Sequence, residues 1–119
     1  MDKCSIWLDK TGSEVEWMYL RDSSETWGFQ VEGELIGFSW PELRGVIKWN
    51  QDIRFLLMPS LRQLGSVQSE ILHNLMWLSQ HDVTVLTPGI EKGVCVYDFN
   101  TIQCLREFAR IDVHLALTA

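Results

Sequence analysis

The sequence lacks any long hydrophobic run and any recognisable secretory leader. A membrane-spanning helix needs about 20 consecutive apolar residues, and the apolar runs of this 119-residue chain are much shorter. The start, Met1-Asp2-Lys3-Cys4, has no basic flank followed by an apolar stretch, which predicts that no signal peptide is present. We therefore expect a soluble cytoplasmic protein.

Cysteine is scarce and its spacing is uninformative for chemistry. Cys4, Cys95 and Cys104 are odd in number and lack C-x-x-C spacing, which predicts reduced thiols and no disulfide. Cys95 and Cys104 lie on or beside periodic apolar positions, where a free cysteine packs as a small hydrophobe. A catalytic thiolate needs a base or a positive field nearby, and His114 is a base that the sequence leaves open. We expect no catalytic cysteine.

Motifs for metals, phosphates and nucleophiles are also missing. His73, His81 and His114 form no H-x-x-x-H pair, so we expect no metal site. No glycine-rich loop joins a strand to a helix as phosphate binding requires, and no Ser nucleophile elbow is present. Asp98 follows a strand, a place where catalytic acids occur, but capping the next helix, or simply being solvated, is the better interpretation. We expect no catalytic residue and no cofactor.

Positive charge is scarce too. Ten Lys and Arg face sixteen Asp and Glu, which gives a net charge of −6. Such a balance argues against nucleic acid or an anionic membrane as the main partner. A basic protein or a cation remains open.

The length and the composition are those of a folded domain. The length is close to the commonest domain size, which predicts a single domain over residues 1–119. Apolar residues make up 46% of the chain and include six Trp, so a sizeable core is expected. Several of the tryptophans should be part of that core.

The segment Asp52–Pro88 predicts a strand, a long helix and a second strand. Ile53–Met58 is a short apolar run, and Ser60–Gln63 has the Ser-x-x-Gln spacing of a capping box. Apolar residues from Leu64 to Leu78 recur every three or four positions, as on one face of a helix. Val83–Leu86 has the β-branched content of a strand.

The remaining C-terminal residues predict a strand, a helix and a last strand. Pro88–Gly93 predicts a tight connection and Val94–Phe99 a strand; Asn100 is placed to cap a helix over Thr101–Arg110. Val113–Leu117 predicts the last strand. From residue 52 onward the order is βαββαβ, which is the ferredoxin-like order of an antiparallel sheet with two helices on one face.

The N-terminal half predicts a β-meander. Ser5–Leu8 and Glu14–Leu20 are predicted strands, and Trp27–Val31 and Ile36–Trp40 are predicted to form a hairpin around a Glu32-Gly33 turn. Pro41 favours a short helix after it, which Gly45 should keep short. The predicted class is therefore α+β with a mainly antiparallel sheet.

The predicted hairpin places Gly28 opposite Gly37. Two paired glycines leave a thin patch where a backbone or a ligand can approach closely. The alternative is that they relieve twist or crowding beside the tryptophans.

Acidic residues are concentrated between Gly12 and Leu43. This window has one base, Arg21, and seven acids, so its balance of −6 equals that of the whole chain; the acids are Glu14, Glu16, Asp22, Glu25, Glu32, Glu34 and Glu42. The aromatics Trp17, Tyr19, Trp27, Phe29, Phe38 and Trp40 lie in the same window. Acidic residues with aromatic anchors are typical of binders of basic proteins. The alternative is that the carboxylates solvate a sheet edge.

These patterns predict a small acidic binding protein without enzymatic activity. In size, acidity and lack of catalytic motifs the chain is similar to bacterial immunity proteins and antitoxins, which occlude a basic toxin domain, although no motif carries the resemblance. A nucleic-acid-binding protein blocked by phosphate mimicry would be an equivalent partner. The expected partner-binding residues are Glu14, Glu16, Asp22, Glu25, Gly28, Gln30, Glu32, Glu34 and Gly37.

Two alternatives from other classes remain. One is a small-molecule-binding domain or enzyme with an aromatic pocket between sheet and helices, lined by Trp77, Tyr97 and His73. The other is a structural subunit whose surplus tryptophans pack against copies of itself, so a homodimer is left open.

Overall fold

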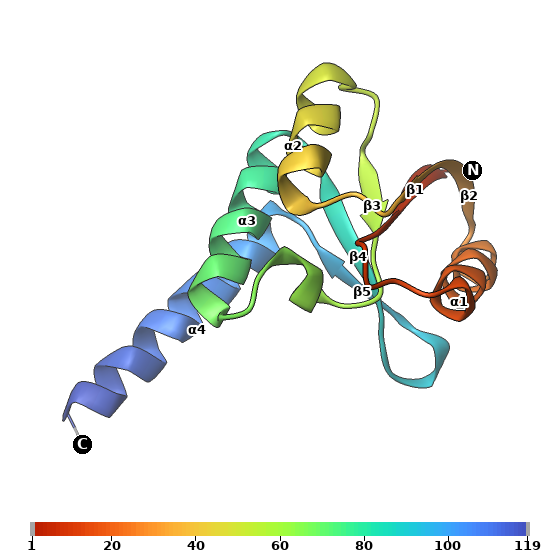
Figure 1. Cartoon of the computed structure of the whole chain (residues 1–119). Helices are drawn as coiled ribbons and strands as arrows, with labels where there is room; N and C mark the ends of the chain where they lie inside the picture. The colour runs from red at the N-terminus through yellow and green to blue at the C-terminus, as the bar shows by residue number, and fades with distance from the viewer. Residues whose placement is uncertain (1, 119) are drawn as a thin grey trace.

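A computed structural model describes the backbone of residues 2–118 and the side chains of residues 2–108 (Figure 1). Strands and helices alternate through most of the chain. The elements are β1 (Asp2–Leu8), α1 (Glu14–Thr26), β2 (Phe29–Ile36), α2 (Trp40–Trp49), β3 (Phe55–Leu57), the 3-10 helix η1 (Leu61–Leu64), α3 (Gln68–Gln80), β4 (Thr84–Pro88), the 3-10 helix η2 (Ile90–Lys92), β5 (Val94–Tyr97) and α4 (Phe99–Thr118).

The five strands form one mixed sheet in the order β2-β1-β3-β4-β5. β1 pairs in parallel with β2 and with β3, β3 pairs in parallel with β4, and β4 and β5 are antiparallel. Both helices and strands are present as predicted, but the mainly antiparallel sheet and the ferredoxin-like order are not found. The physical reason is the helix between each of the first four strands, because a helical crossover returns the chain in the same direction.

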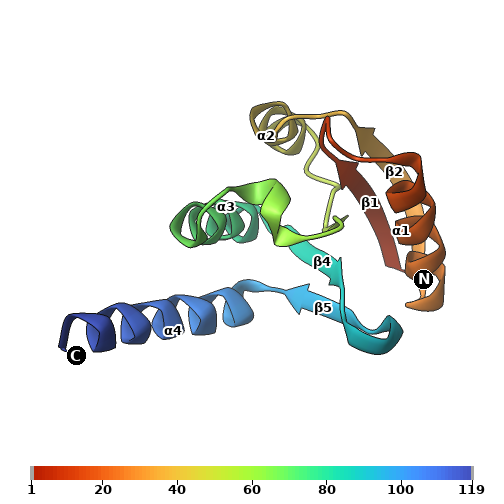
Figure 2. The same cartoon turned by 60° about the horizontal axis from the view of Figure 1, so that its bottom comes forward.

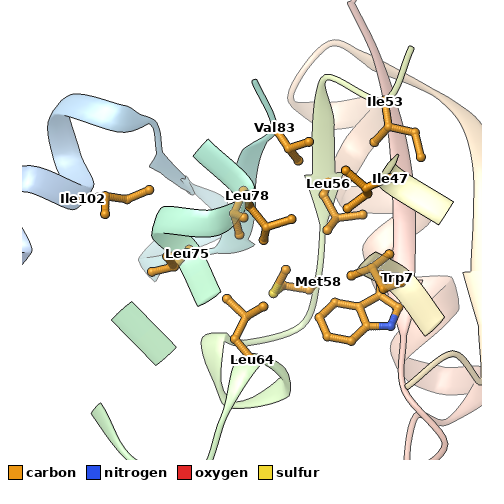
Figure 3. Packing of buried hydrophobic residues seen from close by; sticks show 12 residues of the cluster. Trp7, Ile47, Ile53, Leu56, Met58, Leu64, Leu75, Leu78, Val83 and Ile102 are labelled. Carbon is orange, nitrogen blue, oxygen red and sulfur yellow. The ribbon is translucent and has the colours of Figure 1, made fainter. Parts of the chain in front are cut away.

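Helices cover both faces of the sheet, whereas the sequence predicted two helices on one face. Side chains alternate between faces along β1, so Ile6 and Leu8 pack with Leu20 of α1 on one side. Trp7 points to the other side, where the larger core also contains residues of α2, α3 and the start of α4 (Figure 3). The core residues of the two faces therefore come from different helices.

The predicted strand Glu14–Leu20 is wrong, because these residues begin α1. Ser13 accepts a hydrogen bond from the backbone N–H of Glu16, and the Glu16 carboxylate accepts one from the N–H of Ser13. This reciprocal capping box satisfies donors that the first helical turn leaves free. In the helix Leu20 is buried, whereas Val15 is exposed.

The predicted hairpin is also wrong, because Phe29–Ile36 is one continuous strand. Glu32 does not turn the chain: Val31 lies opposite Cys4 and Gly33 opposite Ser5, so Glu32 is the extra residue of a β-bulge. Gly28 and Gly37 flank the two ends of β2 with φ of 82° and 79°. They adopt the left-handed conformation that glycine favours and do not face each other.

The residues after the predicted hairpin begin α2. Ser39 caps this helix with Glu42 as its capping-box partner, and Pro41 lies in the first turn as predicted. Gly45 does not keep the helix short, since α2 continues to Trp49.

The central strand–helix–strand unit is present with different boundaries. β3 is limited to Phe55–Leu57 and β4 continues to Pro88. Ser60 caps the 3-10 turn η1 rather than the long helix, and α3 begins only at Gln68. Gly65, Ser66 and Val67 separate the two helices, so the apolar stripe predicted as one helix is divided.

The last helix is longer than the sequence predicted. Asp98, and not Asn100, caps it by accepting a hydrogen bond from the N–H of Thr101 at 2.9 Å. This bond holds the pKa of the Asp98 carboxyl below its ordinary value. α4 continues to Thr118, so the strand predicted at Val113–Leu117 is wrong. Figures 1 and 2 show α4 extending away from the sheet.

Candidate functional site

Helix α1 and strand β2 lie side by side at one end of the sheet, and together they carry most of the acidic window (Figure 2). We call their carboxylates the acidic edge. Its members are Glu14, Glu16, Asp22 and Glu25 on α1, and Glu32 and Glu34 on β2. Arg21 is the single cation within these two elements.

Three carboxylates of the acidic edge have local partners. Glu16 caps α1, Glu32 lies 3.7 Å from the Lys3 ammonium, and Glu34 lies 4.0 Å from the Arg21 guanidinium. Both ion pairs are exposed to solvent, and pairs of this kind contribute about 0–1 kcal/mol each. Local pairing therefore offsets part of the charge but leaves the edge acidic.

The other three carboxylates, on Glu14, Asp22 and Glu25, form no ion pair with any side chain that the structure describes. All three are exposed on α1. Exposed like charges on one helix repel one another modestly and contribute nothing to the core. Glu14 lies in the first turn of α1, where a carboxylate favours the helix dipole. Asp22 and Glu25 are therefore the part of the acidic edge that the stability of the chain does not explain.

Glu42, the seventh acid of the window, is separate from the edge. Its carboxylate accepts hydrogen bonds from the Ser39 hydroxyl at 2.9 Å and from the Ser39 N–H at 3.3 Å. These bonds, with the charge of Lys10, hold the pKa of Glu42 below its ordinary value. Glu42 therefore serves to begin α2.

A shallow hollow of about 390 Å³ lies between α1 and β2. Arg21 and Glu25 line it from the helix, and Phe29, Gln30 and Val31 line it from the strand. Phe29 and Val31 are half-buried against the core beneath α1. Two of the expected partner-binding residues, Glu25 and Gln30, therefore lie together in this hollow. The apolar surface beside them is formed by Phe29 and Val31, which were predicted to be part of a hairpin.

A second hollow lies on the other flank of α1. Its lining includes Tyr19, Asp22, Trp27 and Lys92. The Trp27 indole N–H donates a hydrogen bond of 2.8 Å to the Lys92 carbonyl, which fastens the β4–β5 connection to α1. Glu91 and Lys92 both have positive φ in that connection, a conformation that costs non-glycine residues energy. The tight connection predicted at Pro88–Gly93 is confirmed.

Four residues that line these hollows were not among the expected partner-binding residues, although the first two had been placed in the acidic window: Arg21, Phe29, Val31 and Lys92. The signal that could have found the first three is the Ser13-x-x-Glu16 capping box, because it marks a helix start where a strand was predicted. The predicted Gly28/Gly37 patch does not form, since the two glycines terminate opposite ends of β2.

The carboxyl ends of β1 and β3 form the switch point of this winding, where open α/β sheets commonly bind ligands. Gln63 bridges the two loops there: its side-chain N–H donates to the Trp7 carbonyl at 3.0 Å, and its oxygen accepts from the Asp9 N–H at 3.3 Å. The Asp9 carboxylate accepts two bonds from Thr11. The side chains of Gln63 and Asp9 are therefore hydrogen-bonded within the chain and are not presented to a ligand at the switch point.

The cysteines are free, and two of the three are exposed. Cys4 is buried, and burial raises the pKa of its thiol to about 11. Cys95 and Cys104 are exposed, so their predicted packing as small hydrophobes is wrong. Among the side chains that the structure describes, no three His, Cys, Asp or Glu residues lie close enough together to hold a metal ion.

The pocket predicted between Trp77, Tyr97 and His73 for a small molecule does not form in that way. Trp77 packs edge-to-face on Trp40, with ring centroids 5.7 Å apart, and stacks on His81 at 3.9 Å. Tyr97 packs against the larger core, whereas His73 is exposed. The ring of Trp77 therefore packs against Trp40 and His81, and not against the predicted neighbours Tyr97 and His73 in an open pocket.

Comparisons of the chain with protein-family models, with curated proteins and with solved structures find no match. Within the described residues, no helix is both long enough and apolar enough to cross a membrane.

Proposed function

We propose that this chain is a non-enzymatic binding protein whose acidic edge engages a basic protein. The observation that carries the proposal is the concentration of six carboxylates against one cation on α1 and β2. Exposed pairs contribute little to folding, whereas a concentrated field of one sign speeds the encounter with an oppositely charged partner.

The mechanism is occlusion of a basic cleft. The carboxylates of Asp22 and Glu25 take the place of an anionic substrate in that cleft, and the hollow beside Phe29 and Val31 supplies apolar contact area. A small inhibitor of a toxin domain, as in immunity proteins and antitoxins, is the narrower form of this proposal. A phosphate mimic that blocks a nucleic-acid-binding protein would use the same groups.

The association rate tests the proposal. The double variant Asp22→Lys/Glu25→Lys reverses two unpaired carboxylates without touching a helix cap or an ion pair. We expect it to slow association with the basic partner at least about tenfold at low salt, and to flatten the salt dependence of the rate. The partner is isolated from lysate on the wild-type chain, identified by mass spectrometry and purified before the rates are measured.

The matched control is Asp52→Lys/Glu70→Lys, which changes the net charge equally. Asp52 lies in the α2–β3 connection, and Glu70 lies on α3, on the face of the sheet opposite α1. At about 0.1 M ionic strength, where the Debye length is roughly 10 Å, this control should leave the association rate within about twofold of wild type, because charges farther away than that are largely screened. Equal effects of the two variants would contradict the proposal.

A second candidate function, self-association through α4, is favoured by the exposed apolar surface of that helix. α4 has 20 residues, a length of about 30 Å, and it extends beyond the sheet (Figures 1 and 2). Cys104 and Phe108 are exposed four positions apart and therefore share one face, where they line an apolar hollow. Phe108 is 64% exposed, and large exposed apolar surfaces mark interaction sites.

Self-association is tested by analytical ultracentrifugation of the full chain. Phe108→Glu places a charge on the exposed face of α4 and should convert a wild-type dimer into a monomer, because an unpaired charge is costly in an apolar interface. The control Ile90→Glu changes a residue that is 90% exposed in the β4–β5 connection and should leave the dimer intact. A monomeric wild type would refute this candidate.

A further inference from the structure

The outer side of β2 is an open sheet edge. β2 is the terminal strand of the sheet order and has 8 residues, so it spans about 26 Å. Its inner side pairs with β1 from Phe29 to Ile36 except at the bulge residue Glu32, and no described strand pairs with its outer side. Every second residue of such an edge presents an N–H and a C=O that only water satisfies.

The hollow beside α1 opens at this edge. Phe29 and Val31 point to the face covered by α1, whereas Gln30 lies between them and points to the other face. A hollow lined by residues of both faces lies at the margin of the strand, and the inner margin is occupied by β1. The hollow therefore lies where the side chains of an added strand would be placed.

The acidic side chains near this edge favour a basic segment over a second copy of β2 as the added strand. Glu25 lines the hollow, and Glu32 follows Val31 on the strand. A second copy of β2 would bring Glu32 and Glu34 close to the same carboxylates of the first copy, and like charges across strands are destabilising. A segment rich in Lys or Arg would instead find the unpaired carboxylate of Glu25 in the hollow, since the guanidinium of Arg21, which also lines it, lies 4.0 Å from Glu34.

We propose that the outer side of Phe29–Glu32 accepts an extended basic segment of the partner as an additional strand. This inference rests on the proposed function and names its binding mode, strand addition, in which main-chain hydrogen bonds supply affinity and alternate side chains supply specificity. The bulge at Glu32 interrupts the regular pairing, so the added strand ends there. Because side chains alternate between faces, its basic side chains all point to the α1 face, where their stems cover Phe29 and Val31 and their charges reach Glu25. Its apolar side chains point to the other face, beside Gln30.

Three synthetic octapeptides test the inference on the full chain. One alternates Lys and Val, the second has the same sequence with every amide N-methylated, and the third alternates Glu and Val. Methylation of every amide removes the donors of both edges and keeps the charge, so it separates strand addition from simple charge attraction. Amide hydrogen exchange is followed residue by residue by NMR.

The Lys–Val peptide is expected to slow exchange of alternate amides within residues 29–32 at least about tenfold, because an added strand protects them as a ladder does. The N-methylated and the Glu–Val peptides should leave them unchanged. Glu25→Lys should abolish the protection, and Asp52→Lys should preserve it.

The outcomes distinguish this inference from the proposed function. If the two Lys–Val peptides bind equally and slow no amide of β2, the inference is overturned while attraction of basic segments to the acidic edge stands. Protection of the β5 edge in place of β2 would also overturn it. If charge reversal at Asp22 and Glu25 leaves association with the purified partner unchanged, the proposed function fails whatever the peptides do.

Discussion

Leu20→Ala is expected to lower the free energy of unfolding by about 3–4 kcal/mol, whereas Val15→Ala should change it by less than about 0.5 kcal/mol. Leu20 is fully buried among Ile6, Leu8 and core residues of β3 and β4. Val15 is 76% exposed on the same helix. Urea unfolding followed by far-UV circular dichroism measures both changes.

The large effect follows from the arrangement of the layers. Among the described helices, α1 alone packs against the face of the sheet that bears Ile6 and Leu8. No other helix is therefore placed to fill the space left by Leu20. The lost transfer energy and the remaining cavity both add to the destabilisation.

The pair of variants also tests whether residues 14–20 form a helix or a strand. A strand would place Val15, Trp17 and Tyr19 on one buried face and Leu20 on the other. If Val15→Ala proved more destabilising than Leu20→Ala, the helical assignment of this segment would be wrong.

Trp7→Ala is expected to lower the free energy of unfolding by about 3–5 kcal/mol. Trp7 is fully buried and lies among Ile47, Leu56 and Met58 in the larger core (Figure 3). Its ring packs at a tilt against Trp40, with centroids 6.1 Å apart. Its indole N–H donates a hydrogen bond of 2.8 Å to the carbonyl of Phe38. The substitution removes a large side chain and leaves that carbonyl without its donor.

Two controls separate packing from hydrogen bonding. Trp7→Phe keeps most of the apolar volume but loses the N–H, so it should cost an intermediate amount of about 1–3 kcal/mol. Trp49→Ala removes a tryptophan that is 92% exposed and should cost less than about 0.5 kcal/mol. Comparable losses for Trp7→Ala and Trp49→Ala would show that the larger core is not formed as described.

Short-range patterns were predicted well from the sequence. The apolar runs in Ile53–Met58, Val83–Leu86 and Val94–Phe99 contain β3, most of β4 and β5, and Pro88–Gly93 is the connection that turned the chain. Asp98 had been named as a possible cap, although Asn100 was the residue predicted to cap the last helix. These features depend on residues within one or two turns of each other, so their physical causes are visible in the sequence itself.

Residues 14–27 show why one pattern was misread. Val15, Trp17 and Tyr19 alternate as in a strand, while Trp17, Leu20 and Trp27 also recur at helical spacing. The capping box at Ser13 favours the helix, but only burial against the sheet selects which aromatics turn inward. The β-bulge at Glu32 had no comparable signal, because a bulge depends on the register with another strand.

The sequence by itself determined the amount of negative charge and its position between Gly12 and Leu43. Only the tertiary structure decided that α1 and β2 lie together at the edge of the sheet and that Asp22 and Glu25 stay unpaired. Charge is a property of each residue, whereas pairing and exposure depend on which segments the winding of the sheet brings side by side.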